Sequence, residues 1–400
     1  MRVIDPFLSL PGAVEALGPG DAAAGEGDDA AALRPLGAVE HYGAPLAEQR
    51  ALDAGDAIVA LTHHGIVTVS GPDRLSWLHS MTSQQLTGLA PGASVETLLL
   101  GPTGRIEHAI RLVDDGERSW LLVDEGSAEP LAEYLNRMRF ALRVEVTDVS
   151  SEYAAVLAFA GGSALPALRG LGANGGIGPV VEWRDPWAEV APGGVQYAHG
   201  EHPGSGWSAS RLVFPREALA AVAGLVRSGD ASAAGLAALS ALEVRAGRPT
   251  LRAEVDERAI PHELDWLRTA VHLTKGCYRG QETIAKVHNL GHPPRRLALL
   301  HLDGSGGQLP APGALVYSEA TPGAASEPEV RADRPVGRIT RAALHYEWGG
   351  IALALLKRSV PEDAALAVEL AGGERIAAGQ EVIVPADAGA TREIPRLKRL

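Results

Sequence analysis

The sequence predicts a mixed α+β protein that ends in a small β-barrel. Helical and strand patterns alternate between residues 58 and 292, and six short strand patterns with Gly-rich turns follow residue 293. The chain has 400 residues, 46% of them hydrophobic and 21% charged, which is ordinary for globular proteins and enough for two or three cores. Fibrous and wholly disordered structures are therefore excluded.

Charge and cysteine content narrow the class of function. Thirty-six Lys and Arg residues against 49 Asp and Glu residues give a formal charge of -13, which repels a phosphate backbone, so we expect no direct nucleic-acid partner. The single cysteine, Cys277, excludes an intrachain disulfide and a four-thiolate iron–sulfur cluster held by one chain. We expect a cytoplasmic location. No apolar run approaches the ~18 residues of a spanning helix, so we expect no membrane partner.

The first part of the chain is expected to form an extension and an α+β domain. The extension covers 1–57 and contains a mobile acidic loop at 18–33, because small and charged residues without an apolar period cannot offset the entropy of ordering. The domain covers 58–160. Its strands are expected at 58–61, 66–69, 95–100, 105–113, 119–123, 142–149 and 153–159, with helices after Gly71-Pro72-Asp73 and near 128–138.

The rest of the chain is expected to form a second α+β domain and the barrel. Its parts are a connecting segment at 161–204, the α+β domain at 205–292, the barrel at 293–386 and a loose tail at 387–400. Helices are expected near 217–226 and 233–244, and barrel strands at 297–302, 314–317, 336–340, 351–356, 366–370 and 381–384.

The segment Lys275-Gly276-Cys277-Tyr278-Arg279-Gly280-Gln281-Glu282 carries the strongest chemical signal. The chain has only four lysines, yet one of them lies two residues before the only cysteine. Glycines on both sides permit backbone conformations closed to other residues, and the Lys275 ammonium would stabilise the Cys277 thiolate if the two side chains converge. Residues 281–290 then have a helical pattern that ends at Gly291.

A lone cysteine also has an ordinary structural explanation. It is often a small buried apolar side chain, and burial without a nearby charge makes it inert. Spacing alone does not decide between this explanation and a working thiol. The histidines around the segment have no firm ligand spacing, because Gly291 ends the helix between His288 and His292, so we expect no metal site.

Residues 275–282 resemble the K-G-C-[aromatic]-x-G-Q-E signature of the YgfZ family. These are folate-binding proteins related to the T-protein, the aminomethyltransferase of the glycine cleavage system. The resemblance extends to Ala246-Gly247-Arg248-Pro249, to Ile260-Pro261-His262-Glu263 and to 291–297, and it covers roughly 58–384.

The resemblance implies a T-protein-like ring of three domains around a central channel that binds tetrahydrofolate. It implies a role in the assembly or repair of iron–sulfur proteins, with indirect effects on tRNA modification, and it makes Lys275 and Cys277 the functional pair. The implied partners are folate and iron–sulfur client or assembly proteins. A single cysteine can bind an iron–sulfur cluster only if a client, a second copy of the chain or a small thiol supplies the other ligands, so we expect a transient contact. Nothing in the sequence calls for an oligomer, so we expect a monomer.

Three residues are candidate folate contacts at positions where the chain departs from its implied relatives. Glu107, within Arg105-Ile106-Glu107-His108, stands where T-proteins carry acids, and Arg211 stands where they carry a glutamate that holds the pterin. Arginine cannot accept the pterin N–H groups, which disfavours the alternative function, a tetrahydrofolate-dependent aminomethyltransferase or other one-carbon transferase. Arg245 is a candidate partner of the folate glutamate tail, with a solvated charge as its ordinary explanation. A folate sensor without chemistry is a third possibility.

Overall fold

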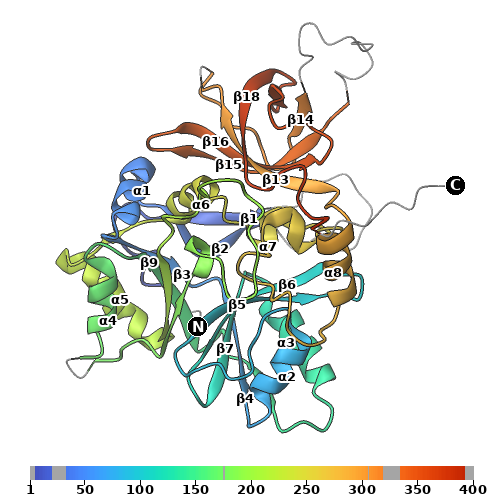
Figure 1. Ribbon diagram of the computed structural model, residues 1–400. Helices are drawn as coiled ribbons and strands as arrows, with labels where there is room; N and C mark the ends of the chain where they lie inside the picture. Colours follow the sequence, from blue (N-terminus) through green and yellow to red (C-terminus); the bar gives the residue numbers. More distant parts are fainter. Residues whose placement is uncertain (1–4, 20–32, 174–175, 305, 319–333, 392–400) are drawn as a thin grey trace, which may run out of the picture.

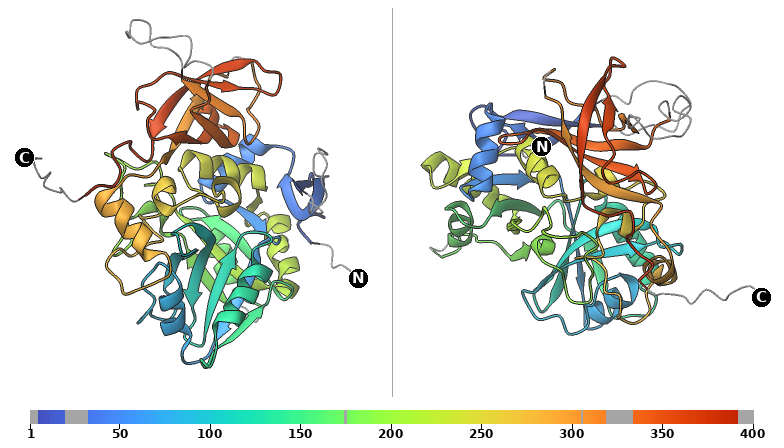
Figure 2. Two further views of the ribbon diagram at one scale, coloured as in Figure 1. Left: turned by 90° about the vertical axis from the view of Figure 1, so that its right-hand side faces the viewer. Right: turned by 45° about the horizontal axis from the view of Figure 1, so that its top comes forward.

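Two five-stranded sheets and a closed six-stranded barrel make up the structure, a computed structural model. The barrel lies at one end of the molecule, at the top of Figure 1, and the sheets lie below it (Figures 1 and 2). The structure describes residues 5–19, 33–173, 176–304, 306–318 and 334–391. Most of the acidic loop expected at 18–33 and of the tail expected at 387–400 lies outside the described residues.

The first sheet has the strand order β10-β11-β9-β3-β12. Its strands are β10 (Val181–Arg184), β11 (Ala209–Pro215), β9 (Tyr153–Phe159), β3 (Ala57–Leu61) and β12 (Ser232–Ala233), with helices α4 (Ala164–Gly170) and α5 (Leu219–Ser228) on one face. The side chains alternate between the two faces of each strand. Ile58 and Phe214 therefore pack under the helices, whereas Val59 and Val213 face the core between the sheets.

The second sheet has the strand order β5-β6-β7-β4-β8. Its strands are β5 (Ser94–Leu100), β6 (Ile106–Asp114), β7 (Arg118–Val123), β4 (Gly65–Ser70) and β8 (Glu145–Asp148), and α2 (Arg74–Met81) and α3 (Ala128–Met138) cover its outer face. The consecutive strands β3 and β4 belong to different sheets. The turn expected at His63-His64-Gly65 therefore carries the chain from one sheet to the other.

A layer of short helices lies between the sheets and the barrel. It contains α6 (Leu236–Arg245), α7 (Leu251–Glu254), the 3-10 turn η3 (Pro261–Leu264) and α8 (Gln281–Leu290), of which α8 has the bounds that the sequence predicts. Two further 3-10 turns are η1 (Pro186–Ala188) and η2 (Arg216–Ala218). Among the described residues, no helix has the length and apolar character needed to cross a membrane.

The expected barrel is confirmed, with one shifted strand. It closes in the order β13-β16-β15-β14-β17-β18. The strands are β13 (Arg295–Leu302), β14 (Leu315–Ser318), β15 (Gly337–His345), β16 (Gly349–Lys357), β17 (Leu366–Glu369) and β18 (Arg375–Val382). The last strand was expected at 381–384. Only Ala378 of β18 is buried, so the apolar pattern that would mark this strand is weak.

Two stretches expected to lie outside the folded domains contribute to them. The connecting segment at 161–204 contains α4 and β10, because Leu165 and Leu168 are buried against the first sheet despite the surrounding glycines. The extension at 1–57 contains the paired strands β1 (Val14–Pro19) and β2 (Leu33–His41) and the helix α1 (Pro45–Asp53). Leu52 of α1 is 0% exposed and belongs to the central core.

Arg341 of β15 joins the barrel to the helical layer. Its guanidinium donates to Glu243 of α6 at 2.6 Å, to Glu254 of α7 at 3.0 Å and to the carbonyl of Arg248 at 2.6 Å. The side chain of Arg341 is 12% exposed and that of Glu254 is 0% exposed. The two carboxylates would therefore be left buried without a counter-ion if this arginine were removed.

We predict that Arg341→Ala lowers the free energy of unfolding by about 3–5 kcal/mol, the usual cost of breaking a buried ion pair. Denaturant unfolding measures it. Arg143→Ala is the matched control, because Arg143 pairs with Asp73 at the surface with 74% of its side chain exposed, and it should leave stability nearly unchanged. Equal losses in the two variants would contradict the role given to Arg341.

Candidate functional site

The 275–282 loop packs against the turn between β5 and β6. Gly280, directly before α8, has φ 82°. A Cβ atom at this position would lie 2.6 Å from the carbonyl oxygen of Gly101 and 3.0 Å from the Cα of Gly104. Only glycine combines this left-handed backbone with so close an approach. The loop is therefore fixed against the second sheet at the point where α8 begins.

Lys275 anchors the loop to the end of α2. Its ammonium donates to the carbonyl oxygens of His79 at 2.5 Å, Thr82 at 2.6 Å and Gln84 at 2.8 Å, and lies 5.0 Å from the ring centroid of Tyr278. An ammonium has three N–H donors, and all three are used. The ammonium is therefore engaged by these carbonyls, and the convergence with Cys277 on which thiolate stabilisation would depend is not seen.

Burial sets the charge state of Lys275. The residue is 7% exposed, and desolvation lowers the pKa of its ammonium to about 7. The ammonium and amine forms are therefore both populated near neutral pH. The three carbonyl oxygens accept hydrogen bonds from Lys275 and so favour its charged form. The attachment of the loop to α2 therefore depends on the protonation state of Lys275.

Cys277 itself is exposed, in a segment whose flanking residues Lys275 and Tyr278 are buried. Lys275 and Tyr278 point into the protein, and Gln281 donates to the carbonyl oxygen of Lys275 at 3.3 Å. Gly276 and Glu282 are exposed like the cysteine. This exposure removes the ordinary explanation of a lone cysteine as a buried apolar side chain.

Glu107 supports the loop. Arg279 donates to the Glu107 carboxylate at 2.9 Å and to the Tyr134 hydroxyl at 2.9 Å. The side chains of Arg279 and Glu107 are 31% and 37% exposed, so this is a surface pair. The structure thus brings two sequence-predicted site residues together, in a role other than the folate contact expected for Glu107.

A cavity of about 150 Å³ lies between the two sheets and α6. Its lining residues are Leu61, His63, His64, Arg111, Asp124, Glu125, Arg211, Leu236, Leu239, Ser240, Glu243, Thr250 and Arg252. Of the three candidate folate contacts, Arg211 alone lines it. Arg245 instead donates to both oxygens of Asp53, at 2.7 and 2.6 Å. No residue of the 275–282 loop lines this cavity, so the loop and the cavity are separate places in the structure.

A charged pair inside this cavity was not predicted from the sequence. Arg111 donates to Asp124 at 2.8 Å, and both side chains are at least nine-tenths buried. Burial would raise the pKa of Asp124, but the Arg111 guanidinium and other nearby positive charges hold it well below its usual range. Arg111 interrupts the apolar residues of β6, and this interruption was the available signal.

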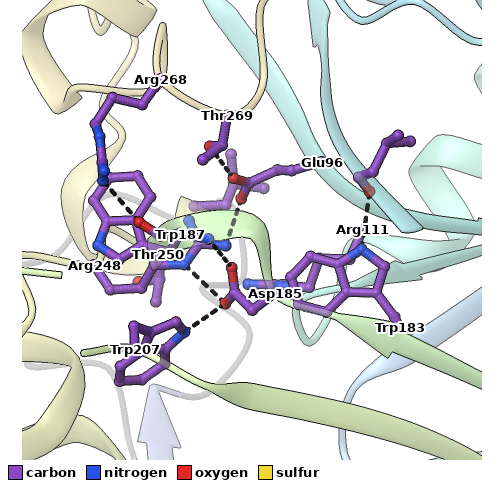
Figure 3. A network of polar contacts seen from close by, with 12 residues as sticks. Glu96, Arg111, Trp183, Asp185, Trp187, Trp207, Arg248, Thr250, Arg268 and Thr269 are labelled. Carbon is purple, nitrogen blue, oxygen red and sulfur yellow. Dashed lines mark hydrogen bonds and ion pairs between the residues drawn. The ribbon is translucent and has the colours of Figure 1, made fainter. Parts of the chain in front are cut away.

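A second missed feature is a buried polar network centred on Arg248 (Figure 3). Arg248 donates to Glu96 of β5 at 2.7 Å and to Asp185 at 3.1 Å. Thr269 donates to the same Glu96 at 2.5 Å, and Trp207 donates to Asp185 at 2.8 Å. The network links both sheets to the segment that leads into the 275–282 loop.

Metal ligands are not grouped in the described part of the chain. No set of three or more His, Cys, Asp or Glu side chains in these residues is placed to hold a metal ion.

The fold is that of the T-protein, as the sequence predicts. The solved structure of the glycine cleavage system aminomethyltransferase T from Bartonella henselae superposes with a TM-score of 0.69, at 18% identity, over 97% of this chain and 98% of that one. At this identity the likeness shows the fold alone.

Three of the relatives that match the sequence illustrate its similarity to known proteins. They are a chloroplastic protein of Arabidopsis thaliana provisionally named a transferase (28% identity over 266 residues), an aminomethyltransferase of Symbiobacterium thermophilum (27% over 316) and a mitochondrial homologue of the iron–sulfur cluster assembly factor IBA57 from Mycosarcoma maydis (25% over 267). The alignments cover 63%, 74% and 64% of this chain and 57%, 82% and 59% of the relatives. The chain thus spans less than two thirds of the Arabidopsis and Mycosarcoma proteins. No family model matches the chain.

We predict that one lysine titrates near pH 7. The chain has only four lysines, so side-chain NMR signals from ¹³C-labelled lysine can be assigned by substitution. A signal with a midpoint near 7 should be present in the wild type and absent from Lys275→Met. If no lysine signal titrates below about pH 9, close to the ordinary lysine range, burial does not control this group.

The same shift predicts a pH dependence of stability. The folded state binds the Lys275 proton more weakly than the unfolded chain, where the lysine pKa is about 10.4. The free energy of unfolding of the wild type, relative to Lys275→Met, should therefore rise by about 1.4 kcal/mol per pH unit above pH 7, toward pH 10. Below pH 7 both states are protonated and the difference should be constant. A difference that does not change with pH would contradict the shift.

Proposed function

We propose that this protein supports the assembly or repair of iron–sulfur proteins and binds tetrahydrofolate. The role in assembly extends to this chain what the name of the Mycosarcoma maydis relative says of that protein. The resemblance of residues 275–282 to the YgfZ signature supports the same role. We further propose that the protein works as a monomer in the cytoplasm, and that any effect on tRNA modification is indirect, through iron–sulfur enzymes.

The observation that carries this proposal is the exposed thiol on an anchored loop. Cys277 is the only thiol of the chain and is exposed, while Lys275 on one side and Tyr278 on the other are buried. Thiolates are the usual ligands of iron–sulfur clusters. Because the thiol is already held in one place, little conformational entropy is lost when a partner binds it. This suits a brief contact with a client protein.

The cluster is cargo in this proposal. One thiolate cannot hold a cluster alone, so the client protein or a small thiol supplies the other ligands. The role of Lys275 is to fix the loop against α2, because its three N–H donors are engaged by carbonyls there.

The cavity at Arg211 is the candidate site for tetrahydrofolate. The cavity has a volume of about 150 Å³ and is open to solvent, so we expect it to take one end of a folate while the rest of the molecule lies outside. Arg211 offers donors and no acceptor. Hydrogen-bond donors without an acceptor suit a carboxylate better than the N–H groups of a pterin. When bound, folate would supply one-carbon chemistry, and the part of the chain described here would hold and orient one end of it.

A tetrahydrofolate-dependent aminomethyltransferase is the second candidate. The alignment with the Symbiobacterium thermophilum aminomethyltransferase favours it, because it covers 82% of that enzyme. The donor character of Arg211 opposes it. Turnover of an aminomethyl donor by the purified protein with tetrahydrofolate would establish this activity, whereas a folate sensor would show neither turnover nor a need for Cys277.

We predict that Cys277→Ser fails to restore iron–sulfur enzymes in cells that lack this gene. The wild-type chain should restore the activities of several such enzymes, because only its thiol can meet the cluster. Thr274→Ala is the matched control, since Thr274 is exposed on the same loop and carries no thiol. It should restore activity fully.

Folding must be checked beside function in this test. Cys277 is exposed, so its substitution should change the free energy of unfolding by no more than about 0.5 kcal/mol. Full rescue by Cys277→Ser would refute the role of the thiol. Normal iron–sulfur enzymes in the deletion strain would refute the proposed function as a whole.

A further inference from the structure

Arg211 occupies a position where the fold calls for an apolar side chain. It lies on β11 between Ala209 and Val213, which face the core between the two sheets. Side chains two residues apart on a strand share a face, so Arg211 points into this core as well. Its exposed fraction is only 4%.

Arg211 has no ion-pair partner among the described residues. One of its terminal N–H groups lies 3.1 Å from Nδ1 of His64, and the ring centroid of Trp183 lies 5.9 Å from its guanidinium carbon. Its Nε is buried and has no hydrogen-bond partner. Burial, together with the positive charge of Arg111, lowers the pKa of Arg211 to about 9, which still leaves the guanidinium charged at neutral pH.

The other charges around the cavity are already paired. Its three carboxylates have guanidinium partners: Asp124 with Arg111, Glu125 with Arg34 and Arg252, and Glu243 with Arg341. His64 is buried, and desolvation and the neighbouring His63 hold its pKa well below the usual range, so it is neutral. Arg211 is therefore the charged residue of this lining that has no ion-pair partner in the described part of the chain.

A buried charge without a partner is unfavourable unless a ligand supplies the opposite charge. A guanidinium binds a carboxylate through two parallel N–H···O bonds, so a carboxylate can supply the partner that Arg211 lacks. The cavity also reaches solvent, because Arg252 lines it and has 41% of its side chain exposed.

We propose that the cavity between the two sheets binds the carboxylate end of a small organic ligand, with Arg211 as the residue that recognises it. The volume of about 150 Å³ accommodates a carboxylate with a short carbon chain. The carboxylate belongs either to the glutamate tail of folate or to a free small carboxylic acid. The claim that the carboxylate comes from folate rests on the proposed function. The claim that the cavity binds a carboxylate does not.

Calorimetric titration of the full-length protein with four probes tests this. Glutarate and p-aminobenzoylglutamate carry carboxylates without a pterin, a tetrahydropterin without the glutamate carries the ring alone, and tetrahydrofolate carries both. Both carboxylate probes should bind the wild type. Arg211→Leu should weaken them about 10- to 100-fold, the usual loss for a hydrogen bond to a charged group. Arg143→Leu, at a surface ion pair, should change nothing.

A second readout separates recognition from a structural role. Because Arg211→Leu removes an unpaired buried charge, its thermal midpoint without ligand should be higher than that of the wild type, and glutarate should no longer raise it. Arg211→Lys keeps the positive charge but loses the planar guanidinium that makes two parallel hydrogen bonds, so this variant should bind the carboxylate probes with intermediate affinity. It replaces Arg211→Leu in the test if the leucine variant does not fold.

The outcomes are distinct. If neither carboxylate probe binds the wild type, or if Arg211→Leu binds them equally well, the carboxylate site is refuted. The site is also refuted if the tetrahydropterin alone binds as tightly as tetrahydrofolate and loses affinity in Arg211→Leu. If the two carboxylate probes bind and tetrahydrofolate does not, the site stands with a free acid as its ligand, and the folate part of the proposed function is wrong.

Discussion

The buried guanidinium of Arg248 is the contact on which the arrangement of the two sheets depends. It pairs with Glu96 of the second sheet at 2.7 Å and with Asp185, which follows the edge strand β10 of the first sheet, at 3.1 Å. The side chains in both pairs are 2–3% exposed. Two carboxylates in such a position need a cation to offset their desolvation, so the two sheet edges and the loop that carries Arg248 must come together as one unit. Thr269 extends the unit toward the thiol loop through its bond to Glu96.

The two candidate functional sites, the thiol loop and the cavity, are separate in the structure. Cys277 lies at the surface on a loop anchored by Lys275 to the end of α2, whereas Arg211 lies inside, at the cavity between the sheets. The anchor of the loop is a cation on carbonyl groups, and the cavity holds a cation without a counter-ion. Because the loop and the cavity are separate, the proposed function does not require a single channel that brings folate directly to the thiol. Under the proposed function, a client would meet the loop and a small ligand would enter the cavity, at places that share no lining residue.

Periodic patterns made much of the fold predictable, and long-range pairing made the rest unpredictable. The helix at 281–290 and the barrel strands followed from local patterns and glycine positions, since these need no knowledge of distant residues. The helix α4 was missed because its glycine-rich surroundings favour a loop, while its burial depends on a sheet formed elsewhere. Lys275 was expected to meet Cys277 through closeness in sequence, yet its partners lie almost 200 residues earlier in the chain. The lack of an ion-pair partner for Arg211 could not be predicted, because it depends on which neighbouring carboxylates already bind other arginines in the folded structure.

Native-state hydrogen exchange of the full-length Arg248→Met protein tests most directly whether this arginine holds the structure together. If it does, amide protection falls together in β5, in residues 185–188 and in residues 265–280, relative to the wild type, because all three lose the same buried counter-ion. Loss of protection confined to the residues beside position 248 would contradict the account. In that case apolar packing between the sheets, rather than the charge of Arg248, would position the loop and the cavity.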